Sequence, residues 1–243
     1  MRSSAVILAV MGLAVCIPVL CQEGLVAHWS MDAAEGNVVA DASNSGHDAT
    51  FFSKDQAAPV FVPGMHGQAV KLDAKLEQGF NVANSADLNF TGPFTVMAWV
   101  KPTRRNATFE IACMKGDKSG EPPWPGWRLR FFWTRAAFQV GTPDGLEPQV
   151  SSAEWSVPAD HWSHVAANWD GTHLRVFVNA VEKAQTEFAG TIAAQPAWRG
   201  LVLGNYMGRK NAYAFDGLMD DVRIYNRALT EDEVFAVASG AGQ

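Results

Sequence analysis

Short apolar runs alternate with clusters of glycine, proline, asparagine and aspartate along most of the chain. This alternation is typical of strands joined by turns. Several runs, such as Phe94–Val100, are apolar at consecutive positions, which suits strands that are buried on both faces. We therefore predict an all-β protein built as a two-sheet antiparallel sandwich. The strands are expected at Leu25–Ser30, Ala69–Asp73, Phe94–Lys101, Phe109–Lys115, Trp127–Trp133, Ala136–Val140, Trp162–Trp169, Leu174–Asn179, Leu201–Gly204 and Leu218–Tyr225.

Two local signals add a hairpin and a helix to this pattern. Asp170-Gly171 separates two of the expected strands, and it indicates a tight hairpin because glycine accepts a positive φ. Thr230 and Glu233 have the spacing of a capping box, in which each side chain bonds a backbone N–H at the start of a helix. This predicts a short C-terminal helix whose apolar side is formed by Val234, Phe235 and Val237.

The first residues have the pattern of an export signal. One positive charge at Arg2 precedes the uncharged stretch Ala5–Leu20, which is shorter than the roughly 20 apolar residues of a bilayer span. We predict a cleaved signal peptide over residues 1–21 and one domain over residues 22–243, with no membrane span after cleavage. The mature protein is then expected to be secreted, periplasmic or at the cell surface. Lipidation at Cys16 or Cys21 and a retained signal anchor are the alternatives.

Composition narrows the class of protein. Hydrophobic residues make up 48% and charged residues 18%, which is enough apolar material for a sizeable core. Nine Trp and fourteen Phe favour the half-buried surface of a β-sheet. The net charge of −6, without a run of like charges, argues against a nucleic-acid partner. After signal cleavage Cys113 is the one remaining cysteine, so we expect a small core residue and no disulfide within the domain.

Several motifs follow one another in a characteristic order. They are Gly24–Asp32, Asp41–Thr50, Gly67–Asp73, Phe94–Pro102, Trp162–Ala166 with Trp169–Gly171, and Phe215–Leu229. In this order and spacing, from about Gly24 to Val237, the chain resembles the laminin-G-like jelly-roll (concanavalin A-like) domains of exported bacterial proteins. It departs from them at Asn179-Ala180, where the family usually has Asp-Gly.

The resemblance implies a two-sheet jelly roll that serves as a carbohydrate-binding, adhesion or accessory module. Some enzymes of this fold carry a Glu-x-Asp-x-x-Glu strand, because retaining glycoside hydrolysis needs two carboxylates about 5 Å apart. That pattern is missing here, and Asp220-Asp221, being adjacent in a strand, are expected to point to opposite faces. No Gly-x-Ser-x-Gly is present either. We therefore predict no catalytic residues and no enzymatic activity.

Acidic residues near both ends of the domain are candidates for a structural calcium site. Calcium takes six to eight oxygen ligands from carboxylates, amides and carbonyls. If the first and last strands lie side by side, as the resemblance implies, the two groups could meet around one ion. The alternatives are ordinary turn chemistry and, for Asp220, pairing with Arg223. The candidate ligands are Asp32, Asp41, Asp220 and Asp221.

Aromatic residues in loops are candidates for sugar binding, because the C–H face of a sugar stacks on an aromatic ring. Trp29, Trp99, Trp162 and Trp169 fall inside strand motifs and are expected in the core. Trp124 differs, because it lies in a loop rich in proline and glycine that should hold it at the surface. The candidate ligand contacts are Trp124, Trp198, Tyr206, Asn205 and Arg209, with covering of the core edge as the alternative role for the aromatic rings.

The sequence as a whole predicts an extracytoplasmic, non-catalytic binding module. Its expected partner is a glycan. The alternative is a structural or adhesion role in which the same sandwich binds a cell-surface or extracellular protein. A glycoside hydrolase is the third reading, and it rests on the fold alone.

Overall fold

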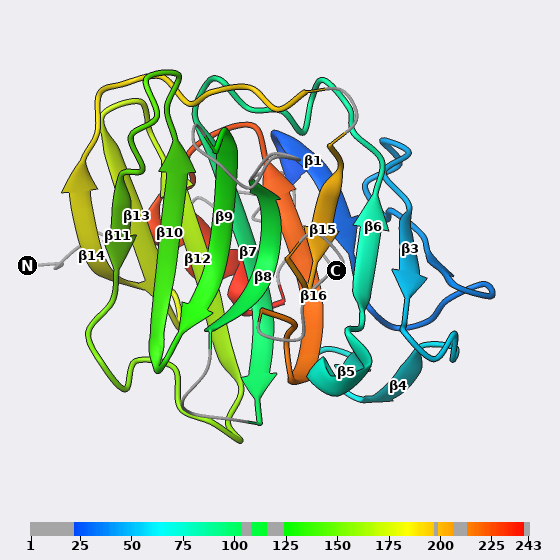
Figure 1. Ribbon diagram of the computed structural model, residues 1–243. Helices are drawn as coiled ribbons and strands as arrows, with labels where there is room; N and C mark the ends of the chain where they lie inside the picture. The colour runs from blue at the N-terminus through cyan, green and yellow to red at the C-terminus, as the bar shows by residue number, and fades with distance from the viewer. Residues whose placement is uncertain (1–21, 104–107, 116–123, 197–198, 207–212, 241–243) are drawn as a thin grey trace, which may run out of the picture.

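Two antiparallel sheets pack face to face in a computed structural model that describes residues 22–103, 108–115, 124–196, 199–206 and 213–240 (Figure 1). Sheet A consists, in spatial order, of β14 (Val181–Glu187), β13 (His173–Val178), β12 (Ser163–Trp169), β7 (Phe94–Pro102), β16 (Gly217–Tyr225), β5 (Gln68–Leu72) and β4 (Val60–Pro63), and β1 (Leu25–Trp29) also pairs with β16. Sheet B consists of β11 (Gln149–Ser151), β10 (Arg135–Gly141), β9 (Gly126–Phe132), β8 (Thr108–Lys115), β15 (Leu201–Leu203), β6 (Gly79–Val82), β3 (Ala49–Phe52) and β2 (Val38–Val39). This arrangement confirms the predicted all-β jelly-roll sandwich.

All ten expected strands are present, and none of their ends differs from the expected one by more than one residue. Six strands were not expected, namely β2, β3, β4, β6, β11 and β14. β14 shows why: it lies at the edge of sheet A, and its side chains alternate between exposed and half-buried positions. Edge strands like this one bury little apolar surface, so they lack the apolar run that identifies a central strand.

Both turns next to β13 use left-handed backbone. Asp170-Gly171 forms the expected hairpin, with Gly171 at φ 97°. The following turn, where the sequence departs from the family, places Asn179 at φ 51° and Ala180 at φ 62°. The Asn179 side chain stabilises this turn by accepting a hydrogen bond from the His164 N–H at 3.0 Å.

The hydrophobic core lies between the sheets and is filled from alternate strand positions. On β7, Phe94, Val96, Ala98 and Val100 face inward, and Phe94 lies 5.3 Å from the Trp127 ring of sheet B. Trp29 and Trp169 belong to this core, as predicted.

Two other tryptophans lie elsewhere. Trp99 is buried but falls between inward-facing Ala98 and Val100, so it lies on the outer face of sheet A. Trp162 precedes β12 and is only half-buried. Trp99 is therefore buried as expected, although not between the sheets, and only the core assignment of Trp162 is wrong. The sequence motif does not reveal strand alternation or strand ends, which decide which ring faces inward.

The predicted C-terminal helix is present as α2 (Glu231–Ala238), and Thr230 and Glu233 form its capping box. Val234 and Val237 pack with Met97 and Tyr225 on the outer face of sheet A, and α2 is visible behind the sandwich in Figure 1. Phe235 was expected on the same side, but it is 63% exposed, so that assignment is wrong. Among the described residues, no helix is both long and apolar enough to cross a bilayer.

The core assignment of Trp169 can be tested by truncation. Trp169 packs against Phe188 with ring centroids 5.7 Å apart, and its indole N–H donates to the Phe188 carbonyl oxygen at 3.0 Å. Trp169→Ala is expected to lower the free energy of unfolding by about 3–5 kcal/mol, as measured by chemical denaturation. Trp155→Ala, at a side chain that is 63% exposed, is the matched control and should change it by less than about 1 kcal/mol. Equal effects would contradict the assignment.

Candidate functional site

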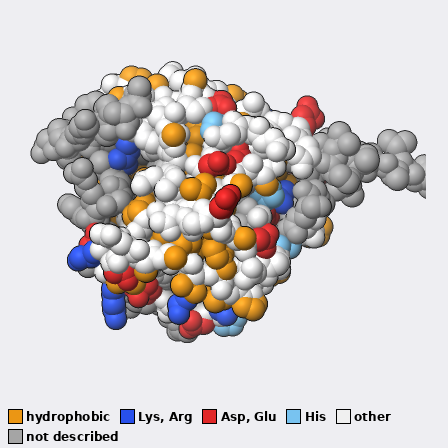
Figure 2. All heavy atoms as spheres, turned by 90° about the vertical axis from the view of Figure 1, so that its right-hand side faces the viewer, with side chains coloured by type: hydrophobic (Ala, Val, Ile, Leu, Met, Phe, Trp, Pro, Cys, Tyr) orange, Lys and Arg blue, Asp and Glu red, His pale blue; other side chains and the backbone are white. Residues whose placement is uncertain are grey.

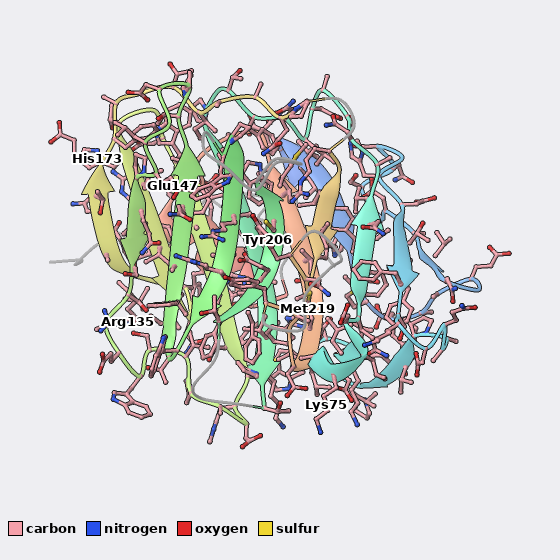
Figure 3. The ribbon with its side chains drawn as sticks, viewed as in Figure 1. Lys75, Arg135, Glu147, His173, Tyr206 and Met219 are labelled. Carbon is pink, nitrogen blue, oxygen red and sulfur yellow. The ribbon has the colours of Figure 1, made fainter. Side chains whose placement is uncertain are left out.

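An aromatic pocket lies on the outer face of sheet B. It is lined by Trp124, Arg128, Glu147, Tyr206 and Tyr213 and has a volume of about 200 Å³. Figure 3 shows Tyr206 and Glu147 over this face of the sheet. The structure thus brings together two of the predicted ligand contacts, Trp124 and Tyr206, which are far apart in the sequence. The other two loop candidates, Trp198 and Arg209, lie outside the described residues.

Arg128 forms the polar centre of the aromatic pocket. It points outward from β9 because its neighbours Trp127 and Leu129 are buried in the core. Its Nε donates to the Gln139 Oε1 at 2.7 Å, and its Nη1 donates to the Glu110 Oε1 at 3.3 Å. These bonds fix the guanidinium in one orientation.

Two tyrosine rings lie beside this guanidinium. The Arg128 guanidinium carbon is 5.9 Å from the centroid of the Tyr206 ring, and the Tyr206 and Tyr213 rings are 5.4 Å apart. Burial, together with nearby Cys113, raises the pKa of Tyr206, so its phenol keeps its proton near neutral pH. The pocket therefore offers aromatic faces together with a fixed hydrogen-bonding group.

Asn205 holds the backbone of Tyr206 in place. Its side chain is fully buried, and its Oδ1 accepts a hydrogen bond from the Tyr206 N–H at 2.7 Å. Its Nδ2 donates to the carbonyl oxygens of Glu77 and Gln78. Asn205 was predicted as a ligand contact, but the structure places it behind the wall of the pocket, where it holds the loop in place.

Trp124 is held at the start of β9 by a tight junction. Two residues after Trp124, β9 begins at Gly126, which has φ 90°. A Cβ at this position would lie 1.9 Å from the Met114 carbonyl oxygen, so only glycine fits. Gln195 donates from Nε2 to the carbonyl oxygens of Pro125 and Met114. The segment Trp124–Gly126 is therefore fixed next to the sheet.

Three lining residues of the aromatic pocket, Arg128, Glu147 and Tyr213, were missed by sequence reasoning. Arg128 had a detectable signal, because an arginine that alternates with buried aromatic and aliphatic residues in a strand must face outward. Glu147 and Tyr213 lie in connections, and only the fold shows that these connections approach β9.

The face of sheet B that carries the pocket lacks a pair of catalytic carboxylates on β8. Glu110 is fully buried and paired with Arg128, and because the register of β8 shifts between Glu110 and Ala112, the next outward position on the strand is Cys113, opposite Arg128. Retaining hydrolysis would need a second carboxylate about 5 Å away, on the same face of the strand. What the pocket offers is ring stacking and hydrogen bonding, which is the chemistry of binding.

A second pocket lies where the two ends of the domain meet. β1 pairs with β16, as expected for the first and last strands, and this pairing brings Asp32 and Asp221 into one pocket of about 330 Å³ with His28 and His66. Figure 2, which shows one side of the molecule, displays acidic side chains singly or in small groups. The expected meeting of the two acidic groups therefore occurs only in part.

The carboxylates expected to bind calcium accept hydrogen bonds from N–H and O–H groups instead. Asp41 Oδ1 accepts from the N–H groups of His28 and Ser43, both at 2.9 Å, and its Oδ2 accepts from the Ser43 hydroxyl and the His47 N–H. Asp32 Oδ1 accepts from the Gln68 N–H at 2.7 Å.

Asp221 is engaged in the same way. Its Oδ1 lies 2.7 Å from His28 Nε2 and accepts from Arg223 Nε at 2.9 Å. In the described part of the chain, no three His, Cys, Asp or Glu side chains form a group that could hold a metal ion. Calcium also takes amide and backbone carbonyl oxygens, so a calcium site at these residues stays a prediction.

Asp220 and Asp221 do not point to opposite faces, as had been predicted. Met219 and Val222 both belong to the core, so the two aspartates between them lie outside it. The register of β16 against β7 shifts at this point, and Asp221 has φ 45°. A β-bulge of this kind inserts one residue and resets the alternation. Asp220 does not pair with Arg223; its Oδ2 accepts hydrogen bonds from the N–H groups of Met65 and His66.

Trp99 lies between two titratable groups on the outer face of sheet A. It is paired with His164 on β12 and with Asp220 on β16. Burial raises the pKa of Asp220 to about 6, although the hydrogen bonds from His66 and Met65 oppose the shift. Burial lowers the pKa of His164 to about 4. Relative to the unfolded chain, burial therefore shifts both groups toward their uncharged forms.

Comparison with known proteins agrees with this fold. Residues 74–235 match the profile described as the concanavalin A-like lectin/glucanases superfamily. Human usherin is 24% identical to this chain over 161 residues, which cover 60% of this chain and 3% of usherin. The chain thus spans a small part of that relative.

Two solved structures have similar folds. The binding domain of Paraclostridial Mosquitocidal Protein 1 has a TM-score of 0.70 at 16% identity, over 90% of this chain and 53% of that one. Domain 4 of AbnA, a GH43 extracellular arabinanase from Geobacillus stearothermophilus in complex with arabinotriose, has a TM-score of 0.66 at 22% identity, over 88% and 98%. At these identities the likeness concerns the fold.

The two buried titratable groups predict opposite pH dependences of stability. The raised pKa of Asp220 gives stability that is present below pH 3.8 and lost as pH rises to about 6. The lowered pKa of His164 gives stability that is present above pH 6.5 and lost as pH falls to about 4. In the wild type the two effects should largely cancel between these limits.

Asp220→Asn keeps an acceptor for the two N–H groups and should expose the contribution of His164. Relative to wild type, its free energy of unfolding should fall by about 2–3 kcal/mol as pH drops from 6.5 to 4. His164→Gln should show the reverse slope. Denaturant titrations across this pH range measure both. Parallel profiles for all three proteins would mean that neither group is shifted.

Asp41 predicts a stability effect that does not depend on metal. Asp41→Ala removes the acceptor of four hydrogen bonds and leaves buried N–H groups unpaired, so it should lower the free energy of unfolding by about 2–4 kcal/mol. The loss should be the same with and without a chelator. A fall in the melting temperature of the wild type on chelation, absent in Asp41→Ala, would show that an ion is bound there after all.

Proposed function

This chain belongs to the concanavalin A-like lectin/glucanases superfamily, and from that premise we propose that it is an extracytoplasmic, non-catalytic module that binds a neutral glycan in the aromatic pocket on sheet B. The observation that carries the proposal is the clustering of Trp124, Tyr206 and Tyr213 around the fixed guanidinium of Arg128. Aromatic rings stack on the C–H faces of sugars, while arginine, glutamine and glutamate bond sugar hydroxyls.

The size and charge of the aromatic pocket favour an uncharged sugar. Its volume of about 200 Å³ is below the roughly 300–1,000 Å³ of sites for drug-sized ligands, which suits a single sugar ring. Arg128 is balanced by Glu110, and Glu147 adds a carboxylate to the wall. A pocket without excess positive charge is a poor site for a sulfated or carboxylated sugar.

Two further observations support the proposal. The similar domain of the extracellular arabinanase was solved with arabinotriose, a neutral oligosaccharide. Residues 1–21, which lie outside the described residues, have the sequence pattern of an export signal. Both are consistent with a module that meets its glycan outside the cytoplasm.

The proposal predicts that two pocket variants lose affinity without losing stability. Trp124→Ala and Tyr206→Ala should each weaken glycan binding by about tenfold, as expected for a partly exposed stacked ring. Binding can be detected on a glycan array and quantified by isothermal titration calorimetry. Phe235→Ala, at an exposed ring on α2, is the control and should bind like the wild type. Binding should also change little between low and high salt.

Three outcomes would contradict the proposal. The first is a wild type that binds no glycan on the array. The second is wild-type affinity in both pocket variants, and the third is loss of binding at high salt. The last result would point to an anionic ligand instead.

A further inference from the structure

The outer face of β9 continues beyond the aromatic pocket. Arg128, Arg130 and Phe132 occupy alternate positions, while Trp127, Leu129 and Phe131 between them are buried in the core. Alternate strand residues share a face, so the three side chains form one row that leads from the pocket to the turn between β9 and β10. Phe132 and Trp133 at the end of this row are exposed.

Cationic and aromatic groups alternate along this row. The Arg128 guanidinium lies 5.9 Å from the Tyr206 ring centroid, and the Arg130 guanidinium lies 5.3 Å from that of Phe132. The Phe132 and Trp133 rings are 6.4 Å apart and nearly perpendicular. We call this row, from Tyr206 through Arg128, Arg130 and Phe132 to Trp133 and its neighbour Trp155, the β9 strip.

The exposed end of the β9 strip is built from two tryptophans in unusual backbone conformations. Trp133 is 54% exposed at φ 61°, and Trp155 is 63% exposed at φ 64°. Bulky residues rarely adopt a positive φ, and residues held in this way occur preferentially at functional sites. Exposed apolar side chains that gather in one patch, unlike single ones, mark binding surfaces, and Phe132, Trp133 and Trp155 are all exposed.

Hydrogen bonds hold the two tryptophan-bearing loops together. Thr134 Oγ1 accepts from the Trp155 N–H at 2.8 Å, and the Thr134 carbonyl oxygen accepts from the Val157 N–H at 3.1 Å. Arg135 Nη2 donates to the Glu154 Oε1 at 2.6 Å. Figure 3 places Arg135 at the end of sheet B, away from Tyr206. The exposed rings are thus preorganised, which lowers the ordering cost of binding.

The charges of the β9 strip favour a neutral ligand with many hydroxyl groups. Arg128 pairs with Glu110, and Arg135 pairs with Glu154. Arg130 donates to the Gln149 Oε1 at 2.5 Å, and its Nε is buried without a partner. Arg128 and Arg135 thus each have a carboxylate partner, and the Arg130 guanidinium, held by Gln149, lies near Glu110 and Glu147, so the row carries little uncompensated positive charge.

We propose that the ligand is a neutral glycan chain that lies along β9, with one sugar ring in the aromatic pocket and a later ring on Trp133 and Trp155. Arg128 and Phe132 are four residues apart, which is about 14 Å along a strand, more than one sugar ring covers. This inference rests on the proposed function, because it takes the same pocket as one end of the site. It adds that the site recognises an oligosaccharide by its length.

Ladders of oligosaccharides from arabinan, xylan and mixed-linkage β-glucan, from the monosaccharide to the hexasaccharide, are the probes that test the β9 strip. Affinity of the wild type, measured by calorimetry, should rise with chain length in at least one ladder. The double variant Trp133→Ala, Trp155→Ala should weaken hexasaccharide binding by about tenfold and leave the shortest bound members unchanged. Trp124→Ala should weaken binding at every length.

The controls distinguish a loss of binding along the β9 strip from a loss of folding and from a failure of the proposed function. Phe235→Ala should match the wild type, and the melting temperature of the double variant should stay near that of the wild type because both rings are exposed. Affinity that does not depend on length, or unchanged hexasaccharide binding by the double variant, would overturn the strip and leave the pocket intact. A wild type that binds no member of any ladder would overturn the proposed function and the strip together.

Discussion

The pairing of β16 in the middle of sheet A is the constraint on which the rest of the structure depends. One side of β16 pairs with β7, and the other side pairs with β5 near Gly217 and with β1 near Tyr225. A single strand thereby joins the N-terminal, central and C-terminal parts of the chain. The bulge at Asp220 and Asp221 lets both halves of β16 direct apolar side chains inward, since the inserted residue restores the alternation for Val222 and Ile224.

The position of the binding site follows from how sheet B packs on sheet A. Burial of Trp127, Leu129 and Phe131 against the inner face of sheet A forces the residues between them outward, because strand side chains alternate. The same apolar packing that stabilises the sandwich therefore places Arg128 and Arg130 on the free face. On this face Trp124, Tyr206 and Tyr213 line the pocket together with Arg128.

Central strands and the capped helix could be predicted from the sequence because burial on both faces and capping chemistry leave clear local patterns. Edge strands such as β14 could not, since they bury little apolar surface and so lack an apolar run. Half of the site was also visible locally: a proline-flanked Trp124 and a loop residue such as Tyr206. Its other half depends on long-range contacts, for example the approach of Tyr206 to Arg128 on β9, which no local pattern encodes. The prediction that Asp220 and Asp221 point to opposite faces failed because the bulge in β16 depends on strand pairing and leaves no local pattern.

The region around His28 and the outer face of sheet B differ in how far their side chains are already engaged by contacts within the protein. Around His28, the carboxylates of Asp41 and Asp221 already accept hydrogen bonds from the protein, so a ligand would have to replace contacts that hold β1 to β16. On sheet B, hydrogen bonds fix Arg128 and the loops around Trp155, while the rings beside them remain partly or largely exposed. A surface that is rigid before it meets its ligand loses little conformational entropy on binding. The outer face of sheet B therefore combines order with exposure, and this combination supports the proposal that it is the binding face.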